Sequence, residues 1–158
     1  MIQCNGTTLF FKFDVSHNKI VLKVLAIYCN KFGYTPKIKN LESVPEISEG
    51  KSYTECLVAF IQVEESDEEK EVKSRAKKLV NHLKWVLRKN KCKSVILHSF
   101  AHLSESKASI PFAQELFDIA ERKFNNVEIK TAQTPFGYFL DLDIQAPGFS
   151  LARVWTSL

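Results

Sequence analysis

The sequence predicts an α/β fold in which helices pack on a mixed β-sheet, and two observations carry this prediction. Residues 67–90 repeat apolar side chains at three- and four-residue spacing, as an amphipathic helix does. Several shorter segments are rich in the β-branched and aromatic residues that favour strands. Their order, β-β-β-α-β-α-β-β, is typical of a two-layer domain. We expect a single domain over residues 1–158, because a chain of this length can build one core.

Two helices are predicted. The first, over residues 67–90, follows Ser66 and Glu69, which have the Ser-x-x-Glu spacing of a capping box. Its first turn is acidic and its last turn basic, as the helix dipole prefers. The second begins near Ser109 with Pro111 in its first turn. Its buried face is expected to contain Phe112, Leu116, Ile119 and Ala120.

The predicted strands cover residues 7–15, 22–28, 56–63, 94–98, 127–132 and 138–145. The last of them alternates, with Tyr138, Leu140, Leu142 and Ile144 on one face and Phe139, Asp141, Asp143 and Gln145 on the other. Such alternation is typical of a half-buried strand. Residues 38–52 are predicted to form a loop, because they include Pro45, Gly50 and several polar residues. Val154 and Trp155 are expected to close a final strand or helix.

Composition sets limits on where the protein works. No apolar run approaches the roughly 20 residues that cross a membrane, and the N-terminus lacks the order of a signal peptide, so we expect a cytoplasmic protein without membrane contact. The cysteines are far apart and form no Cys-x-x-Cys pair. We therefore expect reduced, buried thiols and no metal site or cofactor. These cysteines are Cys4, Cys29, Cys56 and Cys92.

Positive charge is concentrated on the first predicted helix. The net charge is +4 and the pI is near 8.8, values that permit contact with RNA without requiring it. The cations of this helix either form a solvated face or contact a polyanion, and the sequence leaves both interpretations open. They are Lys70, Lys73, Arg75, Lys77, Lys78, Lys84, Arg88 and Lys89.

Two polar segments follow predicted strands, where α/β scaffolds commonly place their sites. Residues 98–104 contain His98 and His102, whose spacing brings two side chains onto one face only in a helix. His98 is therefore expected to have a satisfied polar role, whereas His102 either faces a pocket or has no specific role. Residues 134–139 contain a Pro-x-Gly turn and several aromatics, which either line a pocket or pack in a hairpin corner. Nucleotide-binding, zinc-protease and serine-hydrolase motifs are missing from the sequence.

Four segments together resemble a known family. The FAHLS sequence at residues 100–104 and the PFGY sequence at residues 135–138, about thirty residues apart, are similar to paired motifs of the archaeal threonyl-tRNA synthetase editing domain. Residues 22–27 and 57–64 resemble two strands of that family. The resemblance covers residues 22–153, and residues 1–21 have no counterpart in it.

The resemblance implies a D-aminoacyl-tRNA-deacylase-like fold, a homodimer and hydrolysis of seryl esters wrongly attached to threonine tRNA. The partner would be the aminoacylated 3′-terminal adenosine of tRNA, with main-chain groups and the ribose 2′-hydroxyl assisting the attacking water. His102 would help to recognise the amino acid, and no cofactor would be needed. The substrate-binding residues would be Ala101, His102, Pro135, Phe136, Gly137, Tyr138 and Phe139.

The chain also departs from the family pattern. The family carries Tyr-Lys where this chain has Phe139 and Leu140, and a Glu where it has Arg153. The family's opening strand ends in His-Ser, where Tyr28 and Cys29 stand here, so these two residues and Arg153 are further site candidates. Our first hypothesis is a free-standing trans-editing deacylase. The alternatives are a non-catalytic module that binds tRNA or the aminoacyl group, and a detached piece of a synthetase.

Overall fold

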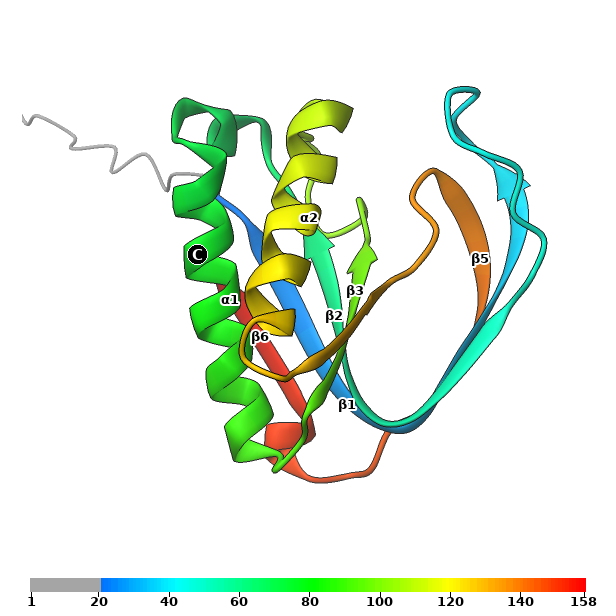
Figure 1. Cartoon of the computed structure of the whole chain (residues 1–158), viewed down its shortest axis with the longest axis vertical. Helices are drawn as coiled ribbons and strands as arrows, with labels where there is room; N and C mark the ends of the chain where they lie inside the picture. Colours follow the sequence, from blue (N-terminus) through cyan, green and yellow to red (C-terminus); the bar gives the residue numbers. More distant parts are fainter. Residues whose placement is uncertain (1–20) are drawn as a thin grey trace, which may run out of the picture.

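The computed structural model describes residues 21–158 as a six-stranded mixed sheet with helices on one face (Figure 1). The predicted strand at residues 7–15 and Cys4 lie outside the described residues. From residue 22 onward the predicted order of strands and helices is confirmed, and the last segment forms a strand. The elements are β1 (Lys23–Lys39), β2 (Lys51–Gln62), the 3₁₀ helix η1 (Glu65–Glu69), α1 (Val72–Lys89), β3 (Ser94–Ser99), α2 (Ile110–Asn125), β4 (Lys130–Gln133), β5 (Tyr138–Gln145), the 3₁₀ helix η2 (Ser150–Ala152) and β6 (Arg153–Ser157).

Strand β1 organises the sheet. The strand order is β4-β3-β2-β1-β5, and β6 also pairs with β1. One edge of β1 pairs antiparallel with β2, while the other edge pairs first with β6 and then with β5. The β2–β3 and β3–β4 pairs are parallel, as the crossover helices α1 and α2 require. Figure 1 shows that the outer half of β1 curves away from the helices and carries β5 with it.

β1 is much longer than the predicted strand at residues 22–28, and the predicted loop at 38–52 is shorter than expected. β1 continues to Lys39, and β2 already begins at Lys51. Gly33 and Pro36 are typical of loops, but both residues pair with β5, whose register shifts just after Pro36. Pairing with a strand about a hundred residues away therefore overrides the local preference.

The first helix begins at Val72, so its predicted start at residue 67 is wrong. The predicted capping box of Ser66 and Glu69 is also wrong, because the reciprocal pair is Glu64 and Asp67 at the start of η1. Asp67 is held by distant groups: its carboxylate accepts a hydrogen bond from the Leu22 N–H at 3.2 Å and pairs with Arg75 at 2.6 Å. The break between η1 and α1 lies at Lys70 and Glu71, whose backbones are extended.

The second helix begins as predicted, with Ser109 at its N-cap and Pro111 in its first turn. The strand after it starts at Lys130 instead of residue 127. The N–H groups of Val127 and Ile129 both bond to the Phe124 carbonyl and close the end of α2. Residues 127–129 therefore form the turn that leads from the helix into β4.

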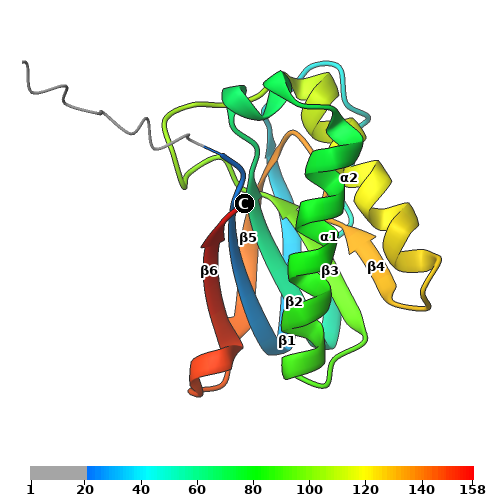
Figure 2. The same cartoon turned by 90° about the vertical axis from the view of Figure 1, so that its left-hand side faces the viewer.

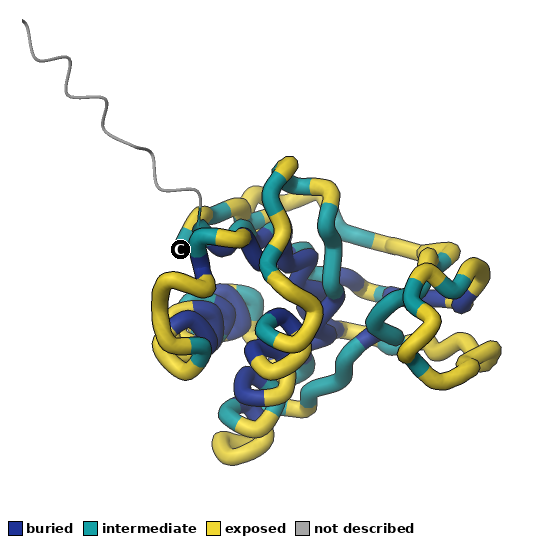
Figure 3. Tube along the Cα trace, turned by 90° about the horizontal axis from the view of Figure 1, so that it is seen from above, coloured by how far each residue is buried: buried dark blue, intermediate teal, exposed yellow. Residues whose placement is uncertain are grey.

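Buried side chains form two clusters, one on each face of the sheet. The larger contains the apolar stripes of α1 and α2 together with Val24, Ala26 and Ala59 of the sheet. Figure 2 shows both helices lying against the sheet, and Figure 3 shows in dark blue the chain segments that are buried. The smaller lies on the opposite face and includes Val58, Phe60, Ile96 and, from the outer half of β1, Phe32 and Tyr34. The predicted alternation of β5 is present, but its apolar face remains partly open, because Leu142 and Ile144 are both exposed.

Cys29, Cys56 and Cys92 are free and buried, as predicted. Burial raises the pKa of Cys29 to about 11 and that of Cys56 to about 12, so both remain thiols at neutral pH. Within residues 21–158, no group of three or more His, Cys, Asp and Glu side chains is arranged to hold a metal ion. None of the helices in this part of the chain is long and apolar enough to cross a membrane.

Candidate functional site

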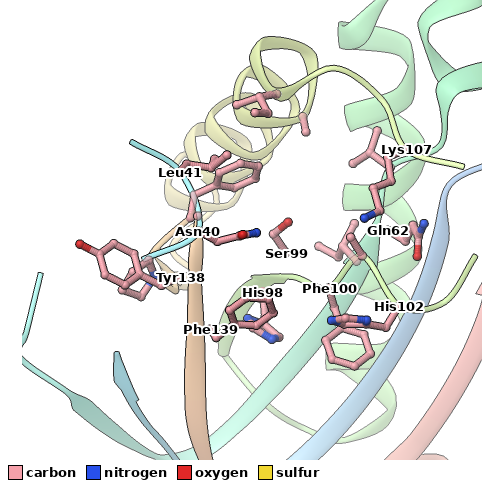
Figure 4. Close-up of a pocket in the computed structure, with 18 of the residues that line it drawn as sticks. Asn40, Leu41, Gln62, His98, Ser99, Phe100, His102, Lys107, Tyr138 and Phe139 are labelled. Atoms are coloured by element: carbon pink, nitrogen blue, oxygen red, sulfur yellow. The ribbon is translucent and has the colours of Figure 1, made fainter. Parts of the chain in front are cut away.

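A pocket of about 460 Å³ lies where β3 and β5 meet the start of α2 (Figure 4). It brings together segments that are far apart in the sequence. Its walls come from the ends of β2 and β3, the loop after β3, the start of α2, the residues after β1, and the turn into β5. The lining residues are Asn40, Leu41, Ile61, Gln62, Val63, His98, Ser99, Phe100, Ala101, His102, Lys107, Ala108, Ile110, Ala113, Pro135, Phe136, Gly137, Tyr138, Phe139, Leu140 and Leu142.

The two motif segments form opposing walls of this pocket. All seven substrate-binding candidates and Leu140 line it, which places residues 101–102 and 135–140 around one cavity. Tyr28, Cys29 and Arg153 do not line it. Cys29 is fully buried in the smaller cluster, Tyr28 packs against Phe149, and the Arg153 guanidinium donates to the Pro147 carbonyl at 2.9 Å.

Gln62, at the end of β2, holds the loop that carries His102. Its side chain is 1% exposed, and both ends of the amide are used. The carbonyl oxygen accepts hydrogen bonds from the N–H groups of Leu103 and Ser104 at 2.6 and 2.8 Å. The amide nitrogen donates to the carbonyls of Ser104 and Ser106 at 3.1 and 2.6 Å. One buried side chain therefore fixes the loop that forms one wall of the pocket.

His98 has the satisfied polar role that the sequence indicated. Its Nδ1 shares a hydrogen bond with the Thr134 hydroxyl at 2.8 Å, and its ring meets the edge of Phe60 at 5.1 Å. Burial, together with the nearby His102, lowers the pKa of His98 to about 4, so the imidazole is neutral at pH 7. Since Thr134 precedes Pro135, this contact joins the two motif segments behind the pocket.

Replacing His98 by Asn is expected to flatten the acid limb of the stability curve. The folded state resists protonation of His98, so stability is unaffected above the unfolded pKa near 6.5 and falls as the pH drops toward 4. The His98 contribution to this loss is about 2–3 kcal/mol between pH 7 and pH 4. Urea unfolding of both proteins at several pH values measures it. The carboxylates contribute equally to the pH dependence of both proteins. If the free energy of unfolding falls with pH in parallel for the two proteins, the loss cannot be assigned to His98.

The turn into β5 depends on Gly137. Its φ is +79°, and a Cβ there would lie 2.9 Å from Leu41, so glycine is required for both backbone and space. The Gly137 carbonyl accepts a hydrogen bond from the Asn40 N–H at 2.7 Å. This contact brings Asn40 and Leu41, which follow β1, into the pocket wall.

Tyr138 lines the pocket with its ring only. Its hydroxyl donates to the Pro45 carbonyl at 2.8 Å and accepts from the Ile47 N–H at 2.9 Å. Figure 4 shows the hydroxyl pointing away from the pocket centre. The hydroxyl therefore holds the loop between β1 and β2 and leaves the ring as a wall.

Four polar side chains of the described pocket lining form no hydrogen bond or ion pair with the protein: His102, described above, and three others. Within the described part of the chain, the side chains of Asn40, Ser99 and Lys107 form no hydrogen bond or ion pair. Figure 4 shows the Asn40 amide pointing toward Ser99, with the Lys107 ammonium on the far side of Ser99. The described lining contains no carboxylate. The site therefore offers hydrogen-bond donors and one cation to a polar or anionic ligand.

Sequence reasoning missed most of these supporting residues. The role of Gln62 could have been predicted from the sequence, because Gln62 is the single polar residue in the apolar stretch at the end of its strand. Asn40 and Leu41 had none, because they fall in a segment expected to be a plain loop. Lys107 had none either, since an exposed lysine in a loop resembles any surface lysine.

Comparison with known proteins agrees with the motif resemblance. A threonine–tRNA ligase of Nitrosopumilus maritimus is 29% identical over 134 residues, which cover 84% of this chain and 21% of that protein. A threonine–tRNA ligase of Pyrococcus furiosus is 31% identical over 141 residues, which cover 84% of this chain and 22% of that protein. The chain thus spans about a fifth of the length of these relatives.

The family assignment rests on a match to a family model. The family model described as the archaea-specific editing domain of threonyl-tRNA synthetase matches residues 22–158. The region includes every element of the sheet, both helices and the whole pocket lining. Because the match extends over nearly the whole chain, this protein belongs to the family of archaea-specific editing domains of threonyl-tRNA synthetase.

Proposed function

We propose that this chain is an aminoacyl-tRNA editing hydrolase that removes serine from wrongly charged threonine tRNA, acting in trans on tRNA charged elsewhere. The family assignment supports an editing role. The observation that carries the proposal further is the pocket, in which residues 101–102 and 135–140 face one cavity. Its volume of about 460 Å³ lies within the range of small-molecule sites and suits a terminal aminoacyl-nucleoside.

The proposed chemistry uses the backbone of the loop after β3. The N–H groups of Phe100, Leu103 and Ser104 are bonded to protein acceptors, whereas those of Ala101 and His102 donate to no other described residue. Two free N–H groups in succession are suited to stabilise the oxyanion that forms when water attacks the ester carbonyl. An aminoacyl ester is already activated, so a positioned water and oxyanion stabilisation suffice for hydrolysis.

The pocket offers few protein groups that could accept the proton of the attacking water. Its described lining includes no carboxylate, and His98 is neutral and bonded to Thr134. Leu140 lines the wall where the family carries its Lys, and Arg153 lies on β6 away from the cavity. His102 also lines the pocket and is assigned to recognition of the amino acid, so the ribose 2′-hydroxyl beside the ester is the proposed proton carrier.

The same observations favour a second candidate, a non-catalytic module that binds the aminoacylated end of tRNA. Incubating the full chain with seryl- and threonyl-charged threonine tRNA and following the ester separates the two. A hydrolase deacylates the seryl form faster than the threonyl form and faster than buffer alone. Tight binding with the buffer rate of hydrolysis for both would leave only the binding module.

Replacing His102 by Ala is expected to lower kcat/KM for seryl-tRNA while leaving the fold intact. His102 is exposed and contacts the ring of Phe100 at 5.0 Å, so it contributes little to core burial. Loss of one substrate hydrogen bond lowers the rate roughly 10- to 100-fold. Glu105→Ala, in the same loop but outside the pocket lining, is the matched control. Unfolding of the His102 variant, or equal effects of the two changes, would contradict this role.

We also propose a homodimer that covers the open apolar face. Ile144 on β5 is 39% exposed and Trp155 on β6 is 56% exposed, and both strands lie on the same edge of β1. Exposed apolar side chains of this kind commonly mark an interface. Light scattering at micromolar concentration is expected to give about twice the 18.1 kDa chain mass, and Ile144→Asp is expected to shift it toward the monomer. A monomeric wild-type protein would count against the dimer.

A further inference from the structure

Helix α1 and the turn after it hold all of the excess positive charge of the chain. Residues 70–93 contain ten Lys or Arg residues and a single acidic residue, Glu71. The remainder of the chain has 12 basic and 17 acidic residues and is therefore net negative. The net charge of +4 is therefore the sum of two unequal parts: residues 70–93 are strongly cationic, and the remainder of the chain is acidic.

The cations of α1 are free, with one exception. Arg75 is buried and paired with Asp67. The others make no ion pair within the described residues, although most of them are exposed. The lysines of β1 behave differently, since Lys31, Lys37 and Lys39 are each paired with an acidic side chain. The free cations are Lys73, Lys77, Lys78, Lys84, Arg88 and Lys89.

The placement of these cations does not stabilise the helix itself. A solvated helix commonly alternates acidic and basic residues four apart, whereas Lys73 with Lys77 and Lys84 with Arg88 place like charges at that spacing. Lys73 also lies in the first turn, where the helix dipole disfavours a cation. Both features work against an isolated helix, so the pattern is better explained by a ligand of opposite charge.

An aromatic side chain lies among these cations. Trp85 is 38% exposed, its ring stacks on His82 at 6.1 Å, and the Lys89 ammonium lies 6.0 Å from the ring centre. Exposed aromatic rings next to cations suit nucleic acid, in which sugars and unpaired bases stack while phosphates bind the cations. An acidic protein surface would match the cations but would leave the ring without a comparable role.

From these observations we infer that the outward face of α1 binds the phosphate backbone of RNA. The RNA is the tRNA whose 3′ end enters the pocket, and this choice rests on the proposed function. α1 is about 27 Å long and presents its six free cations along that length. Figure 2 shows α1 in front of the sheet, where its outer side is covered by no other described element. Phosphate contacts of this kind supply affinity without reading sequence.

The test compares two triple variants that lose the same charge. Lys73→Gln, Lys77→Gln and Lys84→Gln are combined on α1, and Lys31→Gln, Lys37→Gln and Lys51→Gln are combined on the sheet. Binding of uncharged threonine tRNA is followed by fluorescence anisotropy at several salt concentrations. The α1 variant is expected to bind roughly 10- to 100-fold more weakly, with a salt slope reduced by about 2–3, because it loses three phosphate contacts. The sheet variant is expected to change binding by less than about threefold, since only long-range charge is lost.

Two further measurements complete the test. In a Trp155→Phe background Trp85 is the sole tryptophan, and its fluorescence is expected to be quenched when tRNA binds. With seryl-tRNA, the α1 variant is expected to raise KM and to leave kcat near the wild-type value. This split distinguishes loss of RNA binding from loss of chemistry.

The outcomes separate this inference from the proposed function. Hydrolysis of seryl-tRNA with equal binding by the two triple variants would overturn the α1 surface and leave the editing function standing. No salt-dependent tRNA binding by the wild-type protein would overturn the surface, and no hydrolysis would overturn the editing function. Binding to polyglutamate in place of tRNA would point to an acidic protein partner and would also overturn the RNA assignment.

Discussion

Replacing the 2′-hydroxyl of the terminal adenosine by hydrogen is expected to slow deacylation of seryl-tRNA by two to four orders of magnitude. A positioned proton carrier contributes about 10²–10⁴ in rate. No carboxylate lines the described pocket wall, and the neutral imidazole of His98 is bonded to Thr134. His102 also lines the pocket but is assigned to recognition of the amino acid, which leaves the substrate hydroxyl as the proposed proton carrier.

Rates and affinities must be measured on the same pair of tRNAs. Binding of the deoxy tRNA is expected to remain within a few-fold of normal, because phosphate contacts supply most of the affinity for RNA. Activity is also expected to survive a chelator, since the described residues include no cluster of metal-ligating side chains. The spontaneous hydrolysis of each ester in buffer is the control. Full activity on the deoxy substrate would rule out this mechanism.

Replacing Gln62 by Leu is expected to abolish editing and to destabilise the fold by roughly 2–4 kcal/mol, because buried polar groups lose their partners. Four main-chain contacts to Leu103, Ser104 and Ser106 disappear together. The loop that holds Ala101 and His102 then has no fixed position, and a catalytic group displaced by about 1 Å can cost 10²-fold in rate.

A matched control exists in the same sheet. Gln133 on β4 also donates from its amide, but its partners are the side chains of Asp118 and Glu121 at the surface. Gln133→Leu is therefore expected to cost less than about 1 kcal/mol and to preserve activity. Thermal melting and seryl-tRNA deacylation, measured on both variants, compare the two sites. Equal losses in both would show that Gln62 has no special part in holding the loop.

The sequence predicted the parts of the fold that local patterns determine. The apolar stripes of α1 and α2 and the alternation of β5 were visible because helix and strand periods are local. The start of α1 was not, since Asp67 is held not only by its neighbour Glu64 but also by Leu22 and Arg75, which lie further away in the chain. The long β1 was missed for the same reason, because its outer half is sustained by pairing with β5.

The candidate site divides in a similar way. Each of the two motif segments is contiguous in the chain, so a resemblance in sequence is enough to identify them, and folding brings both to one pocket. Asn40, Gln62 and Lys107 come from three other places in the chain, and only the folded sheet brings them together. Arg153 was named from a family position, yet its guanidinium is bonded to the Pro147 carbonyl outside the pocket.

The described domain begins and ends at a single corner. The Leu158 N–H donates to the Leu22 carbonyl at 2.9 Å, and the Leu158 carbonyl accepts from Arg75 at 2.5 Å. Figure 2 shows the C-terminus beside the start of β1, and neither Leu22 nor Leu158 lines the pocket. A carrier protein joined directly before Leu22 or directly after Leu158 would therefore leave from the same corner, away from the pocket lining. The domain is consequently suited to insertion into a loop of another protein, because the two ends of the inserted segment lie side by side.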